Sequence, residues 1–186
     1  QTQRFLITGG SQGIGAATVA LARKAGHQVV FTGRDERLID EVARATGAHG
    51  LRLDVSSAAD NAKAVEACQA RMGGIDVLVN NAAFGYAAEI GDLDVGAMKA
   101  MFDTNVFGLV DMTNRVVPML KAQGDGDIVN IASTSGMKGA ARGTAYAASK
   151  WAVRGISQCW QAELRPHGIR VISVCGVIPA CVEVKK

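Results

Sequence analysis

The chain has 186 residues, of which 48% are hydrophobic and 20% are charged, as in ordinary folded globular proteins. This composition excludes disordered, collagen-like and low-complexity proteins, and the length favours one domain over residues 1–186. The net charge is only +3, and the basic residues form no run of like charge. We therefore expect no binding to nucleic acid or to a membrane surface.

The sequence shows no pattern that would direct the chain to a membrane or hold a metal. No apolar run reaches the roughly 18 residues of a membrane span, and the first residues do not resemble a signal peptide. The four cysteines show no paired spacing with the three histidines, so neither a metal site nor a disulfide framework is expected. A cytoplasmic location with reduced thiols is the resulting expectation.

Short β-branched runs alternate along the chain with segments of helical period. The predicted strands cover residues 4–8, 28–32, 50–54, 75–79, 127–132 and 169–174. The predicted helices cover residues 13–26, 35–47, 57–73, 95–123 and 143–167. This alternation predicts an α/β fold with a doubly wound parallel sheet and helices on both faces. No linker or internal repeat suggests a domain boundary.

A glycine-rich turn, Thr8–Gly15, joins the first predicted strand to the first predicted helix. Glycines allow a tight turn and a close approach of backbone to a ligand, and the N–H groups at a helix start attract anionic oxygen. The turn therefore predicts a dinucleotide pyrophosphate site, although a plain glycine turn is the alternative reading. The predicted contacts are Gly9, Ser11, Gln12, Gly13, Ile14 and Gly15.

Arg34 follows the second predicted strand, where many dinucleotide sites carry an acidic residue that binds the ribose 2′-hydroxyl. An arginine there accommodates a 2′-phosphate instead, so NADP(H) is favoured over NAD(H). Asp35 comes one residue later and is predicted to begin the next helix as an N-terminal acid. A solvated surface charge is the alternative reading of Arg34.

Tyr146 and Lys150 lie four residues apart on a predicted helix and so share one face. Ser133 comes at the end of the fifth predicted strand, thirteen residues before Tyr146. Asn105 lies in the long predicted helix that precedes this strand. A cation beside a phenol favours the phenolate by lowering its pKa, and a serine hydroxyl can hold a substrate oxygen. These residue types suit proton transfer to or from a carbonyl oxygen.

With these motifs in order from Arg4 to about Val174, the sequence resembles the short-chain dehydrogenase/reductase family. Thr8–Gly15 is similar to the family's glycine motif, Asp54-Val55 to its adenine-side pair, and Asn80-Asn81-Ala82-Ala83 to its Asn-Asn-Ala-Gly. The family's catalytic tetrad falls on Asn105, Ser133, Tyr146 and Lys150. The general character is closest to the 3-oxoacyl-carrier-protein reductases.

The resemblance implies a Rossmann-type sheet with strand order 3-2-1-4-5-6. It adds Asp54, Val55, Asn81, Ala82, Tyr146, Lys150 and Gly176 to the expected cofactor contacts. It implies that Tyr146 handles the proton, and that Asn105 keeps a water for proton relay. Local backbone satisfaction is the alternative for Asn105.

The function expected from these features is NADP(H)-dependent interconversion of a small ketone or aldehyde with an alcohol. The alternative is a dinucleotide-binding sensor without turnover. Relatives pair two long helices, so a homodimer or tetramer through 95–123 and 143–167 is expected. The residues expected at that interface are Met98, Met101, Phe102, Trp151 and Trp160.

Three points of the site stay open or depart from the family pattern. Ser135 competes with Ser133 for the serine role, and Phe84 and Tyr86 either line the substrate cleft or merely pack. After the sixth strand Cys175-Gly176 stands where the family has Pro-Gly, and Ala180 where it has Thr. The family's covering loop, final strand and final helices are not matched in the atypical tail 175–186. We therefore expect that this chain binds the cofactor but that its turnover is weak or absent.

Overall fold

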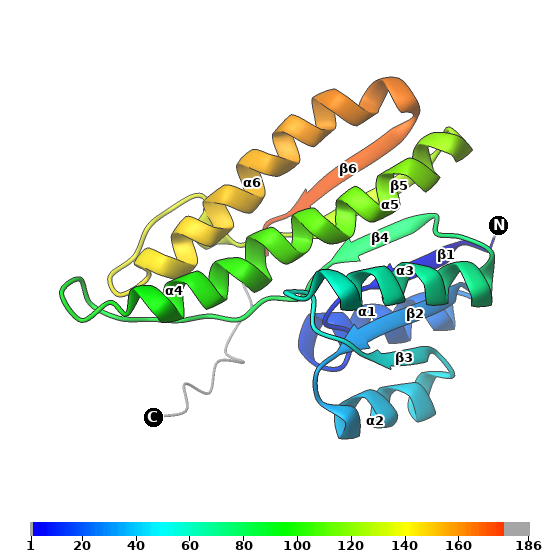
Figure 1. The fold of residues 1–186 in the computed structure, drawn as a ribbon, viewed down its shortest axis with the longest axis horizontal. Helices are drawn as coiled ribbons and strands as arrows, with labels where there is room; N and C mark the ends of the chain where they lie inside the picture. The colour runs from blue at the N-terminus through cyan, green and yellow to red at the C-terminus, as the bar shows by residue number, and fades with distance from the viewer. Residues whose placement is uncertain (1, 177–186) are drawn as a thin grey trace.

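Six parallel strands form one sheet in the order β3-β2-β1-β4-β5-β6 in the computed structural model, which describes residues 2–176 (Figure 1). The strands are β1 Arg4–Ile7, β2 Gln28–Gly33, β3 His49–Arg52, β4 Val77–Asn80, β5 Gly126–Ile131 and β6 Ile169–Val174. Every neighbouring pair is parallel. The predicted doubly wound sheet and its strand order are confirmed, and the strand bounds differ from the predicted ones by at most two residues.

Helices connect the strands and cover both faces of the sheet (Figure 1). They are α1 Gly13–Lys24, α2 Glu36–Thr46, α3 Ala58–Met72, α4 Val95–Phe102, α5 Leu109–Gln123 and α6 Thr144–Leu164. The predicted helix 95–123 is wrong in one respect, because a π-helical segment, Asp103–Gly108, separates α4 from α5. The predicted helix 143–167 ends at Leu164 and continues as a short 3₁₀ turn, Arg165–His167.

Two apolar clusters, one on each face of the sheet, explain why the strands are nearly continuous hydrophobic runs. On one face Cys68 of α3 and Val116 of α5 pack against Leu6 and Leu78 of the central strands. On the other face Val19 of α1 and Ile39 of α2 belong to the second cluster. A parallel sheet covered on both faces needs apolar side chains in both directions, and the sequence supplies them.

Local sequence fixes the helix ends. Asp35, Ser57 and Asp94 cap the N-termini of α2, α3 and α4, each accepting a hydrogen bond from a backbone N–H of the first turn. The predicted role of Asp35 as an N-terminal acid is confirmed. Gly47 and Gly73 end α2 and α3 in the left-handed conformation that glycine adopts without steric cost.

One residue expected at a subunit interface, Met101, belongs instead to the chain's own interior, and a second, Trp160, packs partly against that interior. Met101 is completely buried, so its place in the expected interface is wrong. Trp160 is partly buried and packs against the chain's own apolar clusters. Helical period shows which residues share a face but not which face the rest of the chain covers, and Met101 lies on the covered face of α4.

The structure describes Cys175 and Gly176 but not the later residues. The expectation for Ala180 and for the rest of the tail therefore lies outside the described residues. Among the described helices, none combines the length and the apolar character that crossing a membrane requires.

Candidate functional site

The neighbouring strands β1, β4 and β5 are parallel, so their carboxyl ends lie side by side at the same edge of the sheet. The strand order reverses between β1 and β4, and ligands of open α/β sheets bind in the crevice at such a switch point. The glycine-rich turn follows β1, the segment 81–94 follows β4, and Ser133 follows β5. The topology thus gathers the predicted site residues at one edge of the sheet.

The glycine-rich turn is built so that only glycine fits at its key positions. Gly9 and Gly13 have φ of +63° and +55°, a conformation that side chains disfavour. A Cβ on Gly15 would lie 2.1 Å from the Gly9 carbonyl oxygen and 2.5 Å from Nδ2 of Asn81. The first turn of α1 therefore packs directly on the backbone of the loop.

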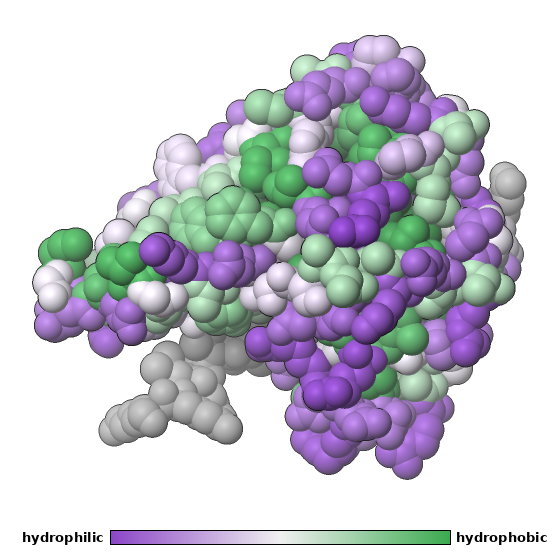
Figure 2. Space-filling model, in the orientation of Figure 1, coloured by the Kyte–Doolittle hydropathy of each residue, from purple (hydrophilic) through white to green (hydrophobic). Residues whose placement is uncertain are grey.

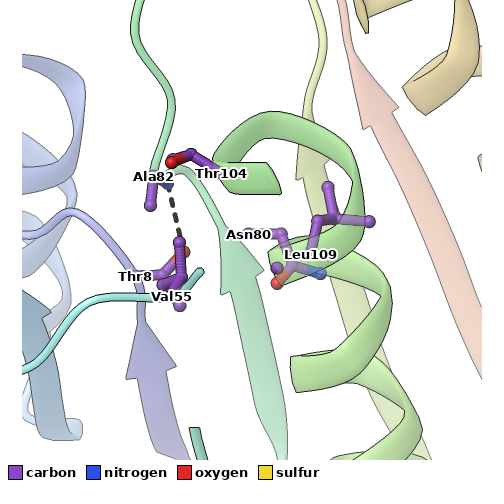
Figure 3. Close-up of a pocket in the computed structure, with 7 residues that line it drawn as sticks. Thr8, Val55, Asn80, Ala82, Thr104 and Leu109 are labelled. Carbon is purple, nitrogen blue, oxygen red and sulfur yellow. Dashed lines mark hydrogen bonds between the residues drawn. The ribbon is translucent and has the colours of Figure 1, made fainter. Parts of the chain in front are cut away.

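Thr8 and Asn81 fix this turn to the end of β4. The Thr8 hydroxyl accepts hydrogen bonds from the N–H groups of Asn81 and Ala82, at 3.0 and 3.1 Å. Figure 3 shows the bond from Ala82. The Asn81 side chain donates to the carbonyls of Thr8 and Gly9, at 3.0 and 2.9 Å. The Asn81 amide group thus holds the glycine turn in place, and its contact with a cofactor stays a prediction.

Arg34, Asp54 and Phe84 lie near one another at the ends of β2, β3 and β4. The side chain of Arg34 is 65% exposed, and its Nη1 lies 4.0 Å from Oδ2 of Asp54. Its guanidinium carbon lies 6.0 Å from the centre of the Phe84 ring. Asp54 is oriented by hydrogen bonds from the backbone and hydroxyl of Ser56, while Val55 is buried.

Tyr146 and Lys150 occupy the first half of α6. Lys150 is only 3% exposed, and its Nζ donates a hydrogen bond of 2.8 Å to the carbonyl of Ile131 at the end of β5. The same Nζ lies 5.7 Å from the centre of the Tyr146 ring. Burial lowers the pKa of the Lys150 ammonium to about 8.

Ser133 caps the short 3₁₀ turn Thr134–Gly136 that follows β5. Its hydroxyl oxygen accepts a hydrogen bond of 3.1 Å from the backbone N–H of Ser135. This bond leaves the Ser133 hydroxyl hydrogen for another acceptor. Ser135 therefore supports Ser133 through its backbone.

Asn105 lies in the π-helical segment and is almost fully buried. Its Oδ1 accepts from the N–H of Phe84 at 3.0 Å, and its Nδ2 donates to the Phe84 carbonyl at 2.9 Å. Its Nδ2 also donates to the hydroxyl of Ser149 at 3.2 Å. The side chain satisfies backbone, as the alternative reading held, but that backbone belongs to the loop after β4.

Two residues near the site were missed by the sequence reasoning. Ser149 is fully buried and contacts Asn105, and a Cβ on Gly136 would lie 2.8 Å from the carbonyl oxygen of Lys150. Gly136 thus lets the turn that carries Ser133 approach α6. The sequence shows a serine directly before Lys150, but it shows neither that Ser149 is buried nor that Asn105 is its partner.

The remaining predicted residues take simple positions. The Tyr86 hydroxyl accepts a hydrogen bond of 2.9 Å from the N–H of Asp94, so this tyrosine supports the start of α4. Ser11 is buried, while Gln12 and Ile14 are exposed at the start of α1. Gly176 is exposed beyond β6.

Comparison with known proteins agrees with this geometry. Residues 3–185 match the family model described as short chain dehydrogenase. An uncharacterized oxidoreductase of Staphylococcus saprophyticus is 37% identical over 180 residues, which cover 94% of this chain and 77% of that protein.

Two solved structures show the same fold. A short-chain dehydrogenase from Streptomyces avermitilis has a TM-score of 0.92 and 30% identity, with coverage of 98% of this chain and 68% of that one. The 3-ketoacyl-(acyl-carrier-protein) reductase from Brucella melitensis, complexed with NADH, has a TM-score of 0.91 and 29% identity, with coverage of 94% and 75%.

The fold and the matched relatives define an oxidoreductase of the dehydrogenase/reductase class. The chain belongs to the short-chain dehydrogenase family. The alternative of a sensor without turnover is not favoured, because the matched relatives are described as oxidoreductases.

Proposed function

We propose that this chain catalyses the NADP(H)-dependent interconversion of a ketone or aldehyde with an alcohol, using Asn105, Ser133, Tyr146 and Lys150. The observation that carries the proposal is the buried Lys150 ammonium, 5.7 Å from the centre of the Tyr146 ring. Burying a cation costs free energy. Buried charged groups are therefore typical of functional sites, where the charge takes part in binding or catalysis.

The residues at the switch point fit a dinucleotide. A Cβ on Gly15 would clash with the Gly9 carbonyl. Because Gly15 has no side chain, the backbone of the turn packs close to the start of α1. Exposed N–H groups at a helix start suit a pyrophosphate, and Asp54 lies beside the adenosine end of such a site. A bound nicotinamide cofactor supplies or takes up the hydride.

The preference for NADP(H) is supported by Arg34. The residue before it is Gly33, so the end of β2 carries no carboxylate to bind a ribose 2′-hydroxyl. Among the described residues, Asp54 is the one acidic partner of Arg34, and the ions are 4.0 Å apart in an exposed place. Such a pair is weak, so the guanidinium remains able to bind a phosphate.

The chain's own residues divide the remaining work. Tyr146 transfers the proton between its phenol and the substrate oxygen, with the Lys150 ammonium 5.7 Å from the centre of its ring. The Ser133 hydroxyl donates to the substrate oxygen, where negative charge develops. Asn105 holds the Phe84 backbone beside the site and maintains a water-mediated path for the proton.

Fluorescence titration with NADPH and NADH, followed by absorbance assays over a panel of small carbonyls, tests the proposal. The panel includes a 3-oxoacyl thioester, because the character of the sequence is closest to reductases of that substrate. We expect tighter binding of NADPH and oxidation of NADPH with at least one carbonyl. Binding without turnover on the whole panel would contradict the enzymatic proposal, and absence of binding would contradict the cofactor site.

A further inference from the structure

We propose that Ser149 is a positioning residue for proton transfer by Tyr146, an inference that rests on the proposed function. Ser149 lies between Tyr146 and Lys150 on α6, and its complete burial closes it off from a substrate or cofactor. It acts by joining the turn of α6 that carries Tyr146 to Asn105 of the π-helical segment.

The hydroxyl of Ser149 makes two hydrogen bonds that use both its donor and its acceptor function. It donates to the Tyr146 carbonyl at 2.8 Å and accepts from Nδ2 of Asn105 at 3.2 Å. The Ser149 residue is 0% exposed, so water cannot replace either partner. Ser149 is therefore a fixed link between two elements that are far apart in the sequence.

This link continues to the segment after β4. Asn105 has its two other side-chain contacts on the N–H and the carbonyl of Phe84. The next residue, Gly85, lies against Tyr146, because a Cβ on Gly85 would be 3.9 Å from Cδ2 of the ring. Ser149 and the Phe84 backbone thus hold the Asn105 amide together, and that amide in turn holds the backbone that leads to Gly85 beside the Tyr146 ring.

The same helix contains a matched control. Ser157 is also 0% exposed, donates to a carbonyl of its own helix, that of Val153, at 2.7 Å, and accepts from Nδ2 of Asn130 at 2.9 Å. Ser157 lies two turns further along α6, where its partner is a strand residue rather than Asn105. The two serines differ mainly in whether their partner belongs to the proposed site.

The experiment compares the purified full chain with Ser149→Ala and Ser157→Ala, measuring thermal unfolding, kcat and the KM for NADPH. We expect similar losses of Tm, because each variant loses the same kind of buried contact. We expect kcat to fall about tenfold for Ser149→Ala alone, since small misplacements of reacting groups cost rate, with the KM for NADPH changed less than about twofold. The double variant Ser149→Ala with Asn105→Ala should be no slower than Asn105→Ala alone.

Each outcome decides between a structural and a positioning role. A kcat within about twofold of the wild type for Ser149→Ala, or equal losses for both serine variants, overturns the inference, as do independent effects in the double variant. Should Ser149→Ala not fold, Ser149→Cys and Ser157→Cys give the same comparison with side chains of similar size. A wild-type chain that binds NADPH without turnover instead overturns the proposed function, before any variant is compared.

Discussion

At the scale of single residues, the site depends on charges and hydroxyls whose surroundings change their chemistry. Lys150 donates to the Ile131 carbonyl and is otherwise enclosed, which lowers its pKa to about 8. Arg34 has the opposite surroundings, since it is mostly exposed and only weakly paired. A buried cation acts on its immediate neighbour, whereas an exposed one remains available to a ligand.

Replacing Tyr146 by Phe removes the phenol while keeping the ring. We expect kcat to fall by at least about 10²-fold, the scale of general acid–base catalysis, with binding of NADPH little changed. Tyr86→Phe is the matched control, because its hydroxyl only accepts a bond from the Asp94 N–H. Steady-state assays and fluorescence titration provide the measurements. If Tyr146→Phe keeps more than half the wild-type rate, the assignment is wrong.

Lys150 predicts a pH dependence of stability. Its pKa is about 8 in the folded chain and 10.5 as the ordinary value, so between these pH values the unfolded chain binds more protons. The free energy of unfolding of the wild type should therefore rise with pH, relative to Lys150→Met, by about 1.4 kcal/mol per pH unit in that window. Urea denaturation of both proteins at pH 7 to 10 measures this difference. A difference that does not change with pH would contradict the lowered pKa.

Arg34→Ala tests the choice of cofactor. A charge-assisted contact with the 2′-phosphate is lost only for NADPH, so the Kd for NADPH should rise at least about tenfold while that for NADH changes little. Arg37→Ala is a suitable control, because Arg37 is an exposed arginine nearby that pairs with Glu41 on α2. Equal weakening for both cofactors, or tighter binding of NADH by the wild type, would count against the NADP(H) preference.

At the scale of elements, the glycine turn and the π-helical segment both hold the backbone in a conformation that a regular strand or α-helix does not adopt. The first turn of α1 sits on the Gly9 carbonyl, and the π-helical segment buries Thr104, Asn105 and Val106 in succession. Irregular helix segments of this kind often occur at functional sites. Close packing of backbone in both places makes the geometry sensitive to a single added atom.

Gly15→Ala adds that atom at the most crowded point. Its Cβ would lie 2.1 Å from the Gly9 carbonyl oxygen, so the turn and α1 must separate. We expect a loss of about 1–3 kcal/mol in stability and at least tenfold weaker binding of NADPH. Gly155→Ala, in the interior of α6 with open space around it, should be neutral or stabilising. Chemical denaturation and NADPH titration test both, and unchanged binding in Gly15→Ala would refute the close-packing argument.

At the scale of the whole molecule, the helices that flank the site also present apolar side chains to solvent. Figure 2 shows hydrophobic surface among hydrophilic atoms over the region of α4 and α5. Phe107 in the π-helical segment is 60% exposed, and Trp151 on α6 is 48% exposed. Large exposed aromatic side chains are typical of interaction surfaces. Trp151 remains an expected anchor of a subunit contact, and Phe107 takes the place of the buried Met101.

We predict a homodimer through α4, α5 and α6, with light scattering at tens of micromolar as the measurement. Replacing Trp151 by Lys should shift the molecule to monomer, because a charge opposes the burial of that surface. Ile90→Lys is the control, since Ile90 is 85% exposed on a loop outside these helices. A wild-type monomer at these concentrations, or a dimer that Trp151→Lys leaves unchanged, would contradict the prediction.

The four proposed catalytic residues come from motif spacing and the family resemblance, and their roles stay a prediction. The sequence by itself determined the alternation of strands and helices and the glycine turn. These features are local or periodic, because burial on both sides of a parallel sheet, capping and turn geometry leave their mark on neighbouring residues. The order of the strands also followed, through the resemblance of the ordered motifs to a family.

Only the tertiary structure decided which distant groups meet. Asn105 binds the backbone of Phe84, Ser149 joins Asn105 to Tyr146, and Met101 turns into the core rather than outward. Helical period shows which residues share a face, but not which neighbour that face meets. Such contacts join segments separated by 21 to 44 residues, and they are set by packing of the whole chain rather than by any local pattern.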